Sequence, residues 1–73
     1  MTMTNEMPTS GRFTAVWLFN GKICSSMLMI DEETSQLMEY SQDAEDYVSS
    51  RENERFYRTP YSWIEKMTFI LDL

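Results

Sequence analysis

Acidic side chains are the residues in this chain whose number and spacing point most directly to a chemical role. The chain has twelve Asp and Glu against six Lys and Arg, which gives a net charge of −6. Nine of these acids lie between residues 31 and 54, where Arg51 is the only base, so this region alone carries −8. Clustered carboxylates can form a catalytic acid–base pair, bind a metal ion or present an anionic surface to a basic partner.

Catalysis and metal binding are the less favoured of these roles. The sequence has no histidine, which removes the commonest general base and the commonest metal ligand. It has only two glycines, so no phosphate-binding glycine pattern occurs. The stretch DEET at residues 31–34 is rich in oxygen but lacks the alternating ligands and the glycine of an EF-hand loop. We therefore expect no enzyme activity, no catalytic residue, no metal site and no cofactor.

The clustering favours an anionic surface that a partner recognises. Solubility alone does not require the acids to be concentrated, and their mutual repulsion opposes folding. A solvated acidic helix and turn is the simpler alternative. On the first interpretation, the partner is a protein with a basic, nucleic-acid-binding surface, and the carboxylates occupy the places of backbone phosphates. The predicted partner-binding residues are Asp31, Glu32, Glu33, Asp43, Glu45, Asp46 and Glu52.

The leading functional hypothesis is a non-enzymatic inhibitor or modulator of a nucleic-acid-handling enzyme. Negative charge argues against direct binding to nucleic acid or to an anionic membrane surface. One alternative is a structural or assembly protein that oligomerises through a β-hairpin. A second alternative is a small RNA-binding barrel that uses Arg51, Arg55 and Arg58.

The strongest local signal is a hairpin that holds the first part of the chain. Two β-rich runs, residues 12–19 and 22–30, flank Asn20-Gly21, the preferred pair for a type I′ turn. This register places Trp17 opposite Cys24 and Leu18 opposite Ile23. Both faces of the hairpin are apolar. One face must cover the core, and the other needs a second layer, barrel closure or a partner such as a second copy in a homodimer.

The rest of the chain contributes shorter elements. Residues 36–41 predict a third strand with Leu37 beside Met29, and one long helix over residues 31–51 is the alternative. Ser41 as an N-cap, followed by acids in the first turn, predicts an acidic helix over 42–53. Residues 63–71 predict a final strand, although a helix that starts at Pro60 also fits the segment 61–73.

The predicted fold class is α+β, a small antiparallel sheet of three or four strands packed with one acidic helix. A flexible tail over residues 1–11 precedes a single domain over 12–73. The first residues lack the basic and apolar regions of a signal peptide, and no run of about 20 apolar residues occurs. With Cys24 as the only cysteine, these features predict a cytoplasmic protein.

The stretch LFNGKICSSMLMIDEE, residues 18–33, resembles the bent strands of Sm-like and other SH3-like small barrels. There a loop of the Asn-Gly type joins two strands, and an Asp follows the second. The resemblance implies a small SH3-like barrel as an alternative fold. Ser26 or its neighbour stands where such barrels have a glycine, and the chain is acidic, so their RNA-binding role is not carried over. In composition the chain is also similar to small acidic phage proteins that disable host enzymes, which implies a viral source.

Overall fold

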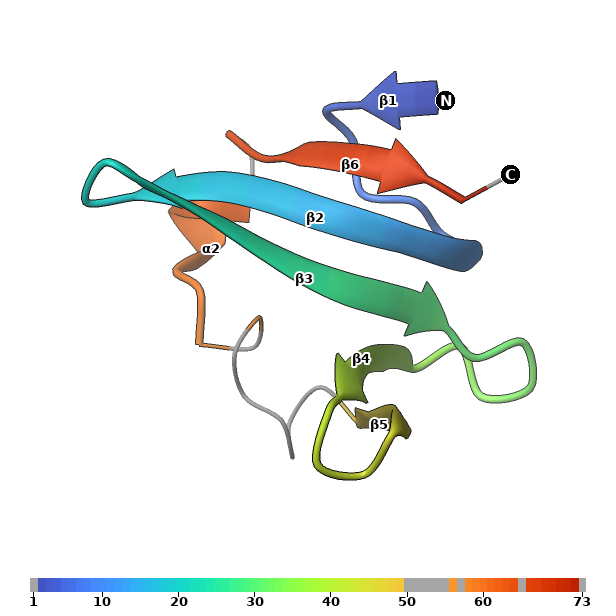
Figure 1. Ribbon diagram of the computed structural model, residues 1–73. Helices are drawn as coiled ribbons and strands as arrows, with labels where there is room; N and C mark the ends of the chain where they lie inside the picture. The colour runs from blue at the N-terminus through green and yellow to red at the C-terminus, as the bar shows by residue number, and fades with distance from the viewer. Residues whose placement is uncertain (1, 50–55, 57, 65, 73) are drawn as a thin grey trace.

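The strands in the described part of this chain join into one antiparallel sheet of six, shown in Figure 1. The computed structural model describes residues 2–49, 56, 58–64 and 66–72. The elements in it are β1 (Thr2–Thr4), β2 (Gly11–Phe19), β3 (Lys22–Ile30), β4 (Leu37–Ser41), β5 (Asp46–Ser49), α2 (Tyr61–Ile64) and β6 (Thr68–Leu71). The strand order is β1-β6-β2-β3-β4-β5.

The predicted α+β class is wrong. The described part of the chain is all-β, and α2 is a single turn of four residues. The strand order is linear, with β1 and β5 at its two ends. The alternative fold, a small SH3-like barrel, stays a prediction.

The hairpin of β2 and β3 is confirmed. Asn20 and Gly21 have φ angles of 51° and 75°, the left-handed values that a type I′ turn requires at both central residues. The register is the predicted one, with Trp17 opposite Cys24. Because the turn fixes this register, the side chains of each strand alternate between two defined faces of the sheet.

The face of the sheet that carries Trp17, here called the inner face, covers the core. The buried apolar residues are Phe13, Ala15, Trp17, Leu28, Phe56, Met67 and Phe69. The rings of Phe13 and Phe69 meet edge to face at 5.9 Å, and those of Trp17 and Phe56 at 6.1 Å. Each such pair contributes about 0.5–1.5 kcal/mol beyond its area burial. Phe56 therefore closes the core on the inner face of the sheet.

Strand β4 is confirmed as a strand, but its register differs from the predicted one by one residue. Leu37 lies opposite Ile30 and not beside Met29. A shift of one residue moves every side chain of a strand to the other face. It therefore brings Glu39, opposite Leu28, onto the inner face.

The acidic helix predicted over residues 42–53 is wrong. The chain turns at residues 42–45 and returns as β5, antiparallel to β4. The rings of Tyr40 and Tyr47, directly opposite each other, meet edge to face at 5.4 Å. Cross-strand aromatic pairs of this kind stabilise a hairpin. The remainder of the predicted helix, residues 50–53, lies outside the described residues.

The local bond expected of a helix cap is nevertheless present in this turn. Ser41 Oγ accepts a hydrogen bond at 3.3 Å from the N–H of Ala44, the residue three positions later. An N-cap serine makes the same bond at the start of a helix. Glu45 then adopts a left-handed φ of 54°, which reverses the chain. A capping serine followed by acids is therefore equally suited to a turn, because its side chain bonds the backbone in both structures.

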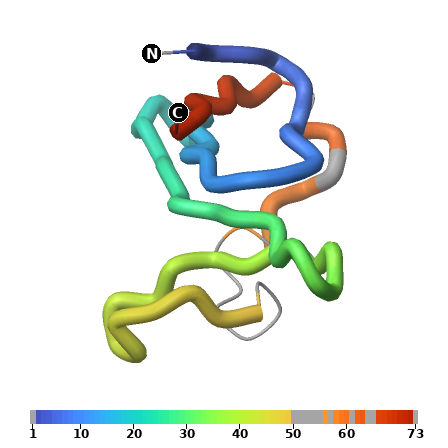
Figure 2. The backbone as a smooth tube through the Cα atoms, turned by 90° about the vertical axis from the view of Figure 1, so that its right-hand side faces the viewer, coloured from blue at the N-terminus to red at the C-terminus, as the bar shows by residue number. Residues whose placement is uncertain are grey.

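The two ends of the described chain lie side by side at one edge of the sheet, the blue and red segments of Figure 2. The predicted final strand is present only as β6, over Thr68–Leu71, because residues 61–64 form α2. β6 lies between β2 and β1. The sequence predicted no strand before Arg12, and Thr2–Thr4 nevertheless pairs with Phe69–Leu71.

Candidate functional site

The predicted acidic surface maps onto two turns. Asp31, Glu32 and Glu33 lie at the turn between β3 and β4, and Glu32 and Glu33 are exposed. Asp31 is half-buried and shapes that turn: its Oδ1 accepts from the N–H of Glu33 at 2.8 Å, and its backbone O accepts from the N–H of Ser35 at 2.8 Å. Asp31 is therefore first a turn-forming residue.

The second acidic turn joins β4 to β5. Asp43, Glu45 and Asp46 lie in or beside it, and all three are exposed. Asp46 Oδ1 accepts from the N–H of Tyr47 at 2.7 Å, which fixes the start of β5. With three exposed carboxylates, this turn has one more than the turn between β3 and β4.

The two acidic turns lie at opposite ends of β4, as Figure 1 shows. With about 3.3 Å per residue, the five residues of β4 separate them by roughly 13 Å. The structure thus divides the acidic region into two patches. Glu52, the last of the predicted partner-binding residues, lies outside the described residues.

Glu39 is an acid of the same region that is not on the surface. Its exposed fraction is 1%, and its carboxylate lies on the inner face between β3 and β5. The Ser26 hydroxyl donates to Oε2, and the N–H of Phe56 lies 3.1 and 3.2 Å from Oε1 and Oε2. Burial of a carboxylate costs several kcal/mol unless charge-assisted hydrogen bonds compensate it, and these two donors supply them.

Glu39 therefore holds Phe56 against the sheet. Its bond to the Phe56 N–H fixes the backbone where the Phe56 ring packs on Trp17. Sequence reasoning counted Glu39 only toward the charge of the acidic region and missed this role. The available signal was Ser26: a hydroxyl on the otherwise apolar inner face of the hairpin requires a buried polar partner.

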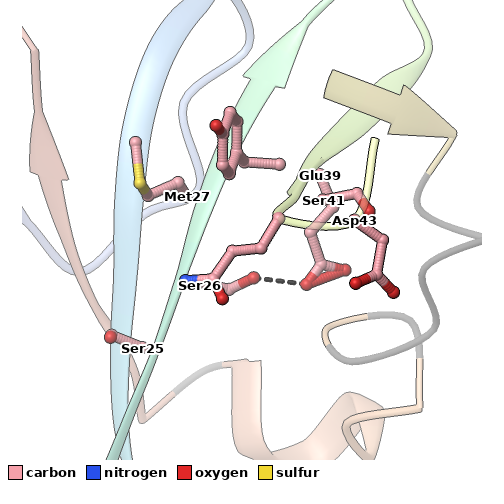
Figure 3. Close-up of a pocket in the computed structure, with 8 residues that line it drawn as sticks. Ser25, Ser26, Met27, Glu39, Ser41 and Asp43 are labelled. Atoms are coloured by element: carbon pink, nitrogen blue, oxygen red, sulfur yellow. Dashed lines mark hydrogen bonds between the residues drawn. The ribbon is translucent and has the colours of Figure 1, made fainter. Parts of the chain in front are cut away.

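A hollow of about 390 Å³ opens beside this pair, between β3 and the turn after β4. Figure 3 shows Ser26 and Glu39 pointing toward each other, with Asp43 nearby. A serine bonded to a carboxylate has a base but needs an oxyanion-stabilising group and a positioned third residue to act as a nucleophile. Among the described residues, no group of three or more Cys, Asp or Glu is arranged to hold a metal ion. The pair has the geometry of a structural contact.

The opposite face of the sheet is here called the outer face. Because side chains alternate along a strand, it carries Thr14, Val16 and Leu18 of β2. Its large apolar residues are Met3, Val16, Leu18, Ile23, Met27, Met29, Met38 and Ile70. Ile23 is 77% exposed, Leu18 63%, Met3 62% and Met27 51%. Antiparallel sheets that face water on one side alternate apolar and polar residues, and this sheet departs from that pattern. The prediction that the hairpin is apolar on both faces is thus confirmed.

No protein-family model matches the chain, and searches of curated proteins and of solved structures likewise give no match. Within the described residues, no helix has the length and apolar character that a membrane crossing requires. Among the described residues, the candidate interaction surfaces are the two acidic turns and the outer face.

Proposed function

We propose that this chain is a non-enzymatic binding protein that modulates a nucleic-acid-handling enzyme by occupying its basic surface. The observation that carries the proposal is the turn after β4, where Asp43, Glu45 and Asp46 are all exposed. Two acidic patches roughly 13 Å apart, one at each end of β4, are separated by about the width of a DNA major groove. Carboxylates at that spacing can stand in for phosphates on the two sides of a groove.

Electrostatic recognition of this kind sets the expected behaviour. Complementary charge accelerates encounter, and salt weakens it because the contacts lie at the exposed rim of the interface. Cys24, a free thiol, suits a reducing compartment, so we propose the cytoplasm as the place of action. Inhibition follows if the partner's nucleic acid and this chain compete for one groove.

The proposal is tested with the triple variant Asp43→Asn, Glu45→Gln, Asp46→Asn. Asparagine at position 46 keeps an oxygen for the Tyr47 N–H, so the turn is preserved. At about 0.5 kcal/mol for each rim contact, loss of the three charges should weaken binding about tenfold.

The matched control adds three charges elsewhere: Asn5→Lys, Thr9→Lys and Ser10→Lys, all exposed in the loop between β1 and β2. Both variants have a net charge of −3, but only the first lacks the acidic turn. The immobilised chain is used to capture proteins from a cell lysate, and duplex DNA in excess is then tested as a competitor. Captured enzymes should be released by DNA and by high salt, and only the acid-turn variant should fail to retain them. Equal capture by the two variants, or retention that neither salt nor DNA reverses, would refute the proposal.

A further inference from the structure

The outer face of the sheet is distinct from the acidic turns in both chemistry and charge. It exposes Ile23, Leu18 and Met27 on neighbouring strands, and Leu18 lies directly opposite Ile23. No strand position on this face is acidic within the described part of the chain, although the protein has a net charge of −6. Asp31 and Asp72 follow the ends of β3 and β6. An acid-free apolar surface on so acidic a protein does not suit the basic partner proposed above.

The cations of this face are few and lie away from its centre. Arg12 lies at one end of β2, with its guanidinium carbon 5.5 Å from the centre of the Tyr47 ring. Lys66 lies at the opposite end, on the rim of a hollow of about 660 Å³ that Leu18 and Ile23 also line. The centre between them is uncharged, so two such faces can meet without burying a charge.

The size of the face is adequate for a specific contact. The strands are three to nine residues long. At a spacing of about 4.8 Å and a rise of about 3.3 Å per residue, the six described strands give a sheet area of roughly 500 Å² along the twisted surface. Projecting side chains raise the accessible area above that value, toward the roughly 800 Å² per partner of a standard interface.

We infer that the outer face binds the outer face of a second copy of this chain, which forms a two-fold symmetric dimer of two packed sheets. Such an interface is isologous, which means that both copies contribute the same residues to the contact. The hollow beside Leu18 and Ile23 receives an apolar side chain of the other copy, and four flexible methionines on each face allow the two surfaces to adapt. The acidic turns stay outside the contact, which makes this inference independent of the proposed function.

The sign of the salt dependence separates this dimer from an acid-driven contact. Two bodies of charge −6 repel each other, and salt screens that repulsion while it strengthens apolar burial. Sedimentation of the wild-type chain across a dilution series should therefore show a monomer–dimer equilibrium that tightens as salt rises. A monomer up to about 1 mM at every salt concentration would overturn the inference, and so would a dimer that dissociates in salt.

The face itself is tested by Ile23→Lys, at the most exposed of its residues. Lysine reduces the net charge and so reduces repulsion, yet it should weaken the dimer about 100-fold, because each substitution occurs twice across the two-fold axis. Thr34→Lys, exposed in the turn between β3 and β4, makes the same change of charge away from the face and should leave the dimer intact.

Circular dichroism and a cooperative thermal transition verify that both variants keep the fold. Leu18→Ser is the second variant if Ile23→Lys does not fold. If the folded outer-face variant dimerises with the same dissociation constant as Thr34→Lys, the inference is overturned. Either result leaves the capture experiment with the acidic-turn variants unaffected, so the two proposals can fail separately.

Discussion

Replacement of Glu39 by alanine should destabilise this protein by about 2–4 kcal/mol. The substitution removes the acceptor for two buried donors, the Ser26 hydroxyl and the Phe56 N–H. Each orphaned donor costs about 1–3 kcal/mol, or roughly 2–6 kcal/mol together. Ser26 lines the adjoining hollow of about 390 Å³, so water can reach its hydroxyl once Glu39 is removed, which places the cost in the lower part of that range.

This loss is large for a chain of 73 residues. At 0.05–0.15 kcal/mol per residue the whole free energy of unfolding is about 4–11 kcal/mol. A loss of 2–4 kcal/mol corresponds to a fall in Tm of about 10–25 °C for a domain of this size. Urea denaturation, followed by circular dichroism and by the fluorescence of Trp17 and Trp63, measures it directly.

A double-mutant cycle identifies the contact responsible. Ser26→Ala alone should cost about 1–2 kcal/mol. In the Glu39→Ala background the same change should cost less by about 1–2 kcal/mol, because it removes a donor that is already unpaired. The matched control is Glu32→Ala, at an exposed acid in the turn between β3 and β4, with an expected change within about 0.5 kcal/mol. Strictly additive effects, or equal stability of Glu39→Ala and Glu32→Ala, would refute the assignment of Glu39 as a buried anchor.

Two further predictions concern the hairpin and its outer surface. Gly21→Ala should lower the free energy of unfolding by about 1 kcal/mol in urea titrations; an added Cβ would meet nothing within 4 Å, so the cost comes from the left-handed φ of 75° and not from a clash. No loss of stability would contradict the type I′ assignment. Arg12→Ala should cost about 0.5–1 kcal/mol by the same measurement, through loss of the cation–π contact with Tyr47. The cost should largely disappear in a Tyr47→Leu background, and persistence there would contradict the contact.

Features that depend on neighbouring residues were predicted well. Asn20-Gly21 determines both the turn and the register of β2 and β3, because only a turn with two left-handed residues matches the twist of the flanking strands. The strand at residues 37–41 also follows from local composition and from the short polar link that precedes it. The number and clustering of the acids, and the absence of histidine, belong to the sequence alone.

Tertiary structure decided what local patterns left open. Both faces of the hairpin are apolar, so only the position of Phe56 and Met67 determines which one is inner. The Ser41 side chain can accept the same backbone hydrogen bond in a helix cap and in a turn. The cross-strand contact of Tyr40 with Tyr47 forms only when the chain turns back as a strand. A single residue of register in β4 moves Glu39 from the surface to the core.

The candidate site shows the same division. The sequence determined that an acidic region exists, and the fold separated it into two turns at the ends of β4 and a buried anchor at Glu39. The physical reason is that charge is a sum over residues, whereas exposure depends on which strand lies beside which, a relation between residues far apart in the chain. The sequence by itself therefore determined the chemistry of this protein's surface, and only the tertiary structure determined where that chemistry is presented.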